Sequence, residues 1–241
     1  MIKFFRHIRQ RLIRENRISK YLLYAIGEII LVVIGILIAL QINNWNESRK
    51  ESLLEDQLID VLITDLQLKK EEFLNDLAIG QSILQKSEET INFWEEHDAM
   101  DTLHLKSLLG ILAEDDWFFN ENSPVYATVS GSGLWKQLPN NLTRQIDAMY
   151  RVNFGSIKSA FEKQGNYALQ AKLNFLAPNH LLNLDTDIKE IQKIVSENDE
   201  AFISFIDLFR SGVVRLTSKF EDFVPAIDKL IEDLEYYKVN K

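Results

Sequence analysis

The densest run of apolar residues lies near the start of the chain, between Tyr21 and Ile42. In this segment 18 of 22 residues are apolar, and none is Lys or Arg. A helix of this length rises about 33 Å at about 1.5 Å per residue, which matches the hydrocarbon thickness of a bilayer. The pattern therefore predicts a single transmembrane helix over residues 21–42.

Beyond this run the apolar residues recur at steps of three, four and seven, which is the period of an amphipathic helix. We expect either a break near Gly80 or a bundle that folds back along the first helix, and a kink or division at Pro225. With only 9 Gly and 4 Pro, the predicted fold class is all-α: a single N-terminal transmembrane helix followed by a long-helix antiparallel bundle. The stripes predict helices over residues 44–97, 103–113, 140–176, 186–196 and 198–237.

The charged residues divide the chain into parts of opposite net charge. Residues 1–20 hold seven Lys or Arg against one acid, a net of +6, whereas residues 43–241 carry a net of −14. The positive-inside rule places the basic tail 1–20 in the cytoplasm and the domain 43–241 outside it. Because an acidic domain repels phosphates, the charge argues against nucleic acid as a partner, and the basic tail is expected to face the lipid bilayer.

The tail and the apolar run also share features with two kinds of targeting segment. A cleaved signal peptide has a shorter apolar core, and residues 40–45 offer no small-x-small cleavage site. A mitochondrial presequence would also be Arg-rich and nearly free of acids. An uncleaved signal anchor fits the length and the flanks of the run best.

Glu28 is the one ionisable residue in the apolar run, and a carboxyl group there raises the free energy of insertion. Glu28, Gly35 and Ala39 are spaced so that they share one helix face, and the last two form a small-xxx-small pattern. This face predicts packing against another transmembrane helix, from a second copy or from a different membrane protein. The alternatives are a protonated or snorkelling Glu28 without a role, and a part in transport.

Three aromatic residues flank the apolar run. Tyr21 and Tyr24 lie at its start, and Trp45 follows its end. Tyrosine and tryptophan are enriched where a membrane meets water, because their rings are amphipathic. We therefore predict these three residues to be membrane-interface anchors.

The first part of the chain resembles a known family. Ala25–Asn46, preceded by the Arg-rich tail, is similar to the start of an uncharacterised family of single-span membrane proteins that is widespread in Bacteroidota, especially flavobacteria. Val125–Pro139 is similar to that family's pattern of a tyrosine, then Ser-Gly, then Leu leading into a helix, with Trp135 and Pro139 as departures. The resemblance implies an inner-membrane protein with a periplasmic domain, and it implies no activity.

The acidic domain offers few patterns that carry chemistry. With no Cys in the chain, disulfides, thiolate metal sites and Cys nucleophiles are excluded. His97, Asp101 and His104 would share a helix face and could hold a metal ion, but a helix N-cap at Asp98 or Asp101 would break that face. We expect the N-cap, and we expect no metal, cofactor or catalytic site.

Two further segments are expected to be structural. Residues 130–133, Ser-Gly-Ser-Gly, lack the spacing of a phosphate-binding loop and predict a helix C-cap followed by a turn. Trp117, Phe118 and Phe119 lie in an acidic loop and are expected to fill the core.

These patterns favour a non-enzymatic protein that binds a partner or a ligand outside the cytoplasm, as a sensor-like or accessory protein. Only about 20 residues would face the cytoplasm, which is too few for an output domain. A second hypothesis is a structural subunit of an envelope membrane complex that docks through the transmembrane helix.

Overall fold

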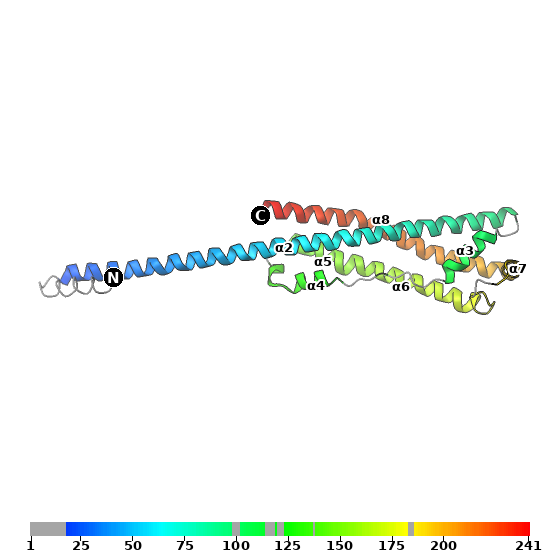
Figure 1. Cartoon of the computed structure of the whole chain (residues 1–241), viewed down its shortest axis with the longest axis horizontal. Helices are drawn as coiled ribbons and strands as arrows, with labels where there is room; N and C mark the ends of the chain where they lie inside the picture. Colours follow the sequence, from blue (N-terminus) through cyan, green and yellow to red (C-terminus); the bar gives the residue numbers. More distant parts are fainter. Residues whose placement is uncertain (1–17, 98–101, 114–118, 120–122, 137, 183–185) are drawn as a thin grey trace. The chain divides into compact units, whose positions relative to one another are not determined.

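The computed structural model of the chain describes residues 18–97, 102–113, 119, 123–136, 138–182 and 186–241. All the regular secondary structure in these ranges is helical (Figure 1). The elements are α2 (Ile18–His97), α3 (Thr102–Ala113), α4 (Pro124–Gly131), the 3₁₀ helix η1 (Gly133–Lys136), α5 (Asn140–Asp147), the π-helix η2 (Ala148–Asn153), α6 (Phe154–Ala171), the π-helix η3 (Lys172–Leu176), α7 (Ile188–Glu197) and α8 (Asp199–Asn240).

The chain divides into two compact units, Met1–Asp56 and Gln57–Lys241. The described part of the first unit consists only of the first part of α2. Within the described residues, one helix is long and apolar enough to cross a membrane, and it contains an 18-residue window of mean hydropathy 2.6. The second unit holds the other helices and the apolar core.

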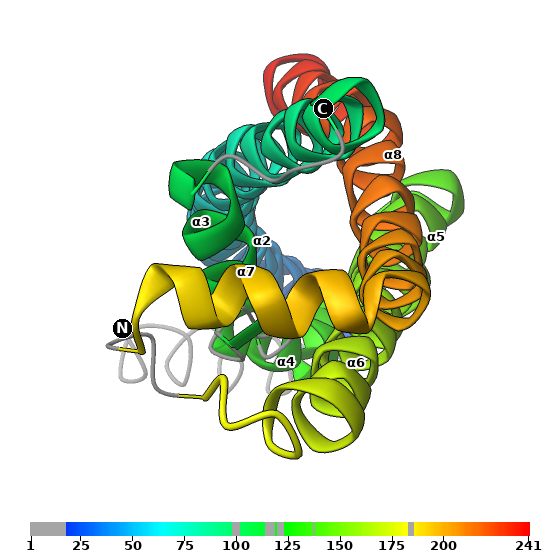
Figure 2. The same ribbon diagram turned by 90° about the vertical axis from the view of Figure 1, so that its right-hand side faces the viewer.

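In the second unit, α8 runs antiparallel to both α2 and α6 (Figure 1). Along α2, Lys70 pairs with Asp228 at 2.6 Å and Asp60 pairs with Lys238 at 2.5 Å. Along α6, Lys219 donates a hydrogen bond of 3.1 Å to the hydroxyl of Ser156. Figure 2 shows α7 lying across one end of this arrangement.

Two apolar clusters form the core of the second unit. The first cluster takes its buried residues from 59–73, 119, 129–161 and 216–234. Phe73 lies at its centre, and its ring contacts Phe154 edge-on at 5.5 Å and Phe220 at 5.3 Å. The second cluster takes its buried residues from 105–112, 168–181, 191–195 and 202–213. Phe119, predicted to fill the core, is buried in the first cluster, while Trp117 and Phe118 lie outside the described residues.

The expected break near Gly80 does not occur, because α2 continues to His97. Gly80 is buried, and a single glycine in a helix costs only about 1 kcal/mol relative to alanine, which packing readily offsets. Pro225 likewise does not divide α8. Pro225 and Glu221 are both exposed, so water can satisfy the Glu221 carbonyl that the proline leaves without a donor.

The predicted helix over residues 140–176 is present, but it contains two π-helical turns that the sequence did not indicate. They are η2, which joins α5 to α6, and η3, which ends α6. The predicted cap and turn at residues 130–133 are also present: α4 ends at Gly131, and Ser132 caps it by donating its backbone N–H to Val129. π-Helical turns occur often at functional sites, which makes η2 a candidate position for such a site.

Candidate functional site

The face predicted for helix packing points outward along the first unit. Gly35 and Ala39 are exposed, and Glu28 is partly buried. A Cβ atom built on Gly35 would meet no other atom within 4 Å. The backbone at Gly35 is therefore accessible to a neighbouring helix.

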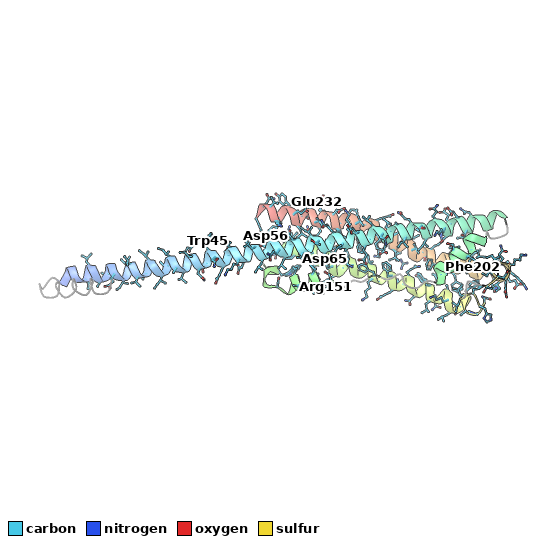
Figure 3. All side chains as sticks on the ribbon, in the orientation of Figure 1. Trp45, Asp56, Asp65, Arg151, Phe202 and Glu232 are labelled. Carbon is cyan, nitrogen blue, oxygen red and sulfur yellow. The ribbon has the colours of Figure 1, made fainter. Side chains whose placement is uncertain are left out.

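The other sequence-predicted residues are only partly described. Trp45 is 64% exposed (Figure 3), whereas the side chains of Tyr21 and Tyr24 lie outside the described residues. Asp101 and the side chains of His97 and His104 lie outside them as well. Among the described residues, no group of three His, Cys, Asp or Glu could hold a metal ion.

A hydrogen-bonded network that sequence analysis did not identify lies where α4 and η2 meet α2. Asp65 of α2 accepts two hydrogen bonds on its Oδ2 atom. One comes from the Tyr150 hydroxyl at 2.6 Å and the other from the Ser123 hydroxyl at 2.9 Å. Hydrogen bonds to a charged acceptor are about twice as strong as those between neutral groups. Asp65 thus joins three segments that are remote in sequence.

A second carboxylate extends this network. Tyr126 of α4 donates its hydroxyl to Oδ1 of Asp147 at 2.5 Å, and Arg151 lies 3.6 Å from the same oxygen. The ring of Tyr126 stacks on the ring of Tyr150, with centroids 4.7 Å apart and an interplanar angle of 9°. Trp135 packs edge-on against Tyr126 at 6.1 Å. We call Asp65, Ser123, Tyr126, Asp147 and Tyr150 the tyrosine–carboxylate network.

Each side chain of the network is positioned by a specific local structure. Ser123 is the N-cap of α4: its hydroxyl oxygen accepts from the Tyr126 N–H at 3.0 Å while its proton goes to Asp65. Tyr150 lies in the middle of η2, and its ring packs edge-on against Phe154 at 5.1 Å. Figure 3 labels Asp65 on α2 and Arg151 on η2, which mark this part of the second unit.

The environment keeps both tyrosines protonated. Burial, and then the hydrogen bond to Asp147, raise the pKa of Tyr126 to about 12. Burial, and then the hydrogen bond to Asp65, raise the pKa of Tyr150 well above its usual range. At neutral pH both phenols are therefore hydrogen-bond donors and neither is activated as a base or nucleophile. The arrangement holds segments together and has no reactive phenolate.

The sequence contained one signal for this network. Asp65 lies between Leu62 and Leu66, which are fully buried, so an acid interrupts the apolar side of α2. A charged residue beside a buried stripe indicates a specific partner, because an unpaired buried charge is costly. Which donors would serve it could not be read from spacing, since they lie 58 and 85 positions away.

A family model described as a family of unknown function (DUF6090) matches residues 28–154, more than half of the chain. The matched segment begins at Glu28 and contains every residue of the tyrosine–carboxylate network. Searches of curated proteins and of solved structures found no match.

Proposed function

This chain belongs to a family of unknown function (DUF6090), and we propose that it is a single-pass inner-membrane protein whose periplasmic helical domain binds a partner or a ligand. In this proposal the protein is sensor-like or accessory and catalyses no reaction. Residues 43–241 form a long-helix antiparallel bundle, and residues 21–42 form the membrane anchor.

The observation that carries the proposal is apolar surface on every side of one helix. An amphipathic helix of a water-soluble domain shows its apolar residues on one stripe and buries that stripe. In the first unit, by contrast, none of the described Leu, Ile and Val residues between positions 22 and 42 is buried, which suits a lipid environment. These exposed residues are Leu22, Leu23, Ile26, Ile29, Ile30, Leu31, Val32, Val33, Ile34, Ile36, Leu37, Ile38, Leu40 and Ile42.

The orientation follows from charge. The net of +6 in residues 1–20 favours a cytoplasmic N-terminus, and the domain after the anchor carries a net of −14. The basic residues also favour contact with anionic lipids of the inner leaflet, each contributing about 1 kcal/mol near the surface. The acidic domain would then lie in the periplasm.

A sensor-like role is supported by the way the network engages α2. The same helix contains the apolar segment and Asp65, whose carboxylate accepts hydrogen bonds from Ser123 and Tyr150. A change in the domain that alters these hydrogen bonds therefore acts directly on the helix that enters the proposed membrane span.

The alternative is a structural subunit of an envelope complex, docked through Glu28, Gly35 and Ala39. The open backbone at Gly35 favours this candidate, because small residues allow two transmembrane helices to approach closely. The partner would be a second copy of the chain or another membrane protein.

The chain contains no native Cys, so an introduced cysteine is the only thiol in it that a maleimide can label. Single cysteines can therefore test the orientation. A membrane-impermeant maleimide should label Ser48→Cys in cells with a permeabilised outer membrane. It should label His7→Cys only after the inner membrane is lysed. The reverse pattern would overturn the proposed topology, and release of the protein by alkaline carbonate would overturn the membrane anchor.

The docking alternative is tested at Glu28. If this face docks, Glu28→Leu should reduce detergent-resistant oligomers or the proteins that cross-link and co-purify from native membranes. Glu28→Gln, which keeps a polar group at the same place, should retain more of them. Unchanged oligomers and partners in Glu28→Leu would contradict docking through this face while leaving the anchor intact.

A further inference from the structure

We infer that residues 123–136, which comprise the N-cap Ser123, α4 and η1, form a strap that opens from α2 and η2 and is held closed by the tyrosine–carboxylate network. The inference concerns a conformational device within the second unit. It does not depend on the proposed membrane anchor.

The strap is weakly anchored by apolar contacts. Among the strap side chains that the structure describes, only Val129 is buried, and Val125, Tyr126 and Trp135 are partly buried against the first cluster. The long helices α2 and α8 are instead joined through rings such as Phe73 and Phe220. Segments with few buried apolar contacts are the ones that open locally while the rest of a domain stays folded.

Both caps of α4 lie within the strap. Ser123 caps the start of α4 by accepting from the Tyr126 N–H at 3.0 Å. Ser132 caps its end, since its hydroxyl donates to the Val129 carbonyl at 2.7 Å. Because both caps lie within the strap, the strap can separate from α2 and η2 without exposing uncapped helix ends.

Hydrogen bonds hold the strap closed, and water can take the place of the donors when the strap opens. Its two fasteners are the hydrogen bonds from Ser123 to Asp65 and from Tyr126 to Asp147, supported by the Tyr126–Tyr150 stack. Asp65, Asp147 and Tyr126 are each partly exposed. On opening, both carboxylates become hydrated, so the net cost of breaking each fastener is far below its strength in a dry interior.

Opening changes the state of α2 and η2. Asp65 loses one of its two donors, and Tyr150 loses the ring that covers its face. The apolar seat of Val129 becomes accessible at the same time. A ligand that prefers the open or the closed strap would therefore shift the environment of Asp65 on α2.

Thiol labelling of the full-length protein in detergent tests the strap. Val129→Cys reports on its seat, and Val213→Cys, buried in α8, is the matched control. In native conditions Val129→Cys should react at least about tenfold faster than Val213→Cys. Adding Asp65→Asn should speed Val129→Cys by a further factor of about ten, since a hydrogen bond to a charged group is worth at least that factor. Low concentrations of urea should speed Val213→Cys steeply and Val129→Cys only slightly, because global unfolding exposes far more surface than opening of the strap.

Equal rates for the two cysteines would overturn the strap, because both would then react only through global unfolding. An unchanged rate of Val129→Cys after adding Asp65→Asn, or equal acceleration of the two cysteines by urea, would overturn it as well. Hydrogen exchange of the chain without any cysteine gives an independent measurement, in case Val129→Cys perturbs the seat. Residues 126–132 should then exchange faster than residues 213–220 and with a weaker dependence on urea, and equal exchange of the two segments would overturn the proposal.

Discussion

The hydroxyl of Tyr150 donates a 2.6 Å hydrogen bond to Asp65, and the two residues lie 85 positions apart in the sequence. Tyr150 is 6% exposed, so its hydroxyl has little access to water as a substitute acceptor. The pair fixes the π-helical turn η2 against α2. This hydrogen bond is the most buried link of the tyrosine–carboxylate network.

Replacing Tyr150 with Phe should destabilise the second unit. The change removes the donor and leaves the ring, so the expected loss in unfolding free energy is that of a hydrogen bond to a charged group, about 1.5–3 kcal/mol. Urea denaturation followed by circular dichroism measures it. Tyr236→Phe is the matched control, since Tyr236 is 72% exposed and should change stability by less than about 0.5 kcal/mol. Equal stability of the two variants would contradict the role of the Tyr150–Asp65 hydrogen bond.

The raised tyrosine pKa values predict a loss of stability at high pH. The pKa of Tyr126 is about 12 in the folded protein and about 10 in an unfolded chain, so the unfolded state releases this proton at lower pH. The stabilisation is complete below about pH 10 and disappears as the pH rises through about 12. The shift of Tyr150 has the same direction and adds to the loss.

Chemical denaturation of the unmodified chain and of Tyr126→Phe between about pH 9 and about pH 12 measures this linkage. The unmodified chain should lose its stability advantage over Tyr126→Phe as the pH rises. A difference that stays constant over this range would show that the Tyr126 phenol titrates alike in the folded and unfolded states.

Gly212 lies where α6 and α8 approach each other closely. A Cβ atom at Gly212 would lie 1.7 Å from Oε1 of Gln164 and 3.0 Å from the ring of Tyr167. Gly212→Ala should therefore destabilise the unit by about 1–3 kcal/mol through overpacking. The matched control is Gly165→Ala in α6, where a Cβ meets nothing within 4 Å and should stabilise the helix by up to about 1 kcal/mol.

A double variant identifies the clash. If the carbonyl of Gln164 causes the loss, Gln164→Ala should relieve much of the penalty of Gly212→Ala, so that the two effects are not additive. Thermal unfolding of the four combinations measures the coupling. Strict additivity would place the cause elsewhere, for example at Tyr167.

Gln164 itself is predicted to be a destabilising residue. Its side chain is 4% exposed, and neither Oε1 nor Nε2 has a hydrogen-bond partner among the described residues. Gln164→Met keeps the length of the side chain and removes the unsatisfied groups, so it should raise unfolding free energy by about 1–3 kcal/mol. Gln170→Met on the exposed side of α6 is the control, expected to stay within about 0.5 kcal/mol. A loss of stability in Gln164→Met would show that the amide is satisfied in solution.

Aromatic packing should outweigh the charged pairs that join α2 and α8. Phe220→Ala removes a fully buried ring that contacts Phe73, and it should cost about 3–5 kcal/mol. Lys238→Ala breaks the pair with Asp60, whose side chain is 57% exposed, and should cost less than about 1 kcal/mol. Denaturant midpoints of the two variants give the comparison, and similar losses would contradict it.

The helical segments could be predicted from sequence because apolar periodicity is local information. The stripes on residues 140–176 and 198–237 correspond to helices whose bounds differ by only a few residues. The π-helical turns could not be anticipated, since each depends on how neighbouring helices accommodate one extra residue. Of the two alternatives for the first helix, a break near Gly80 or a bundle folding back along it, the break does not occur. The sequence could not decide between them, because packing around a buried glycine is invisible in it.

The sequence likewise predicted some residues of the candidate site but not how they pair. Glu28, Gly35 and Ala39 were identified from spacing along one helix, and their packing role stays a prediction. Tyr150 lies within the helix predicted over residues 140–176, yet its partner on α2 could not be named. Pairing between residues so distant in the chain is decided by tertiary structure, which helical periodicity does not encode.

The two core clusters also differ in when they can form during synthesis. The second cluster draws its buried residues from positions 105–213, so it needs no residue after position 213. The first cluster joins positions 59–73 to positions 216–234 and cannot close until positions 216–234 have left the ribosome. The nascent chain therefore carries a partly uncovered apolar face around Phe73 until that point. That interval is when the protein is most exposed to aggregation and to chaperones.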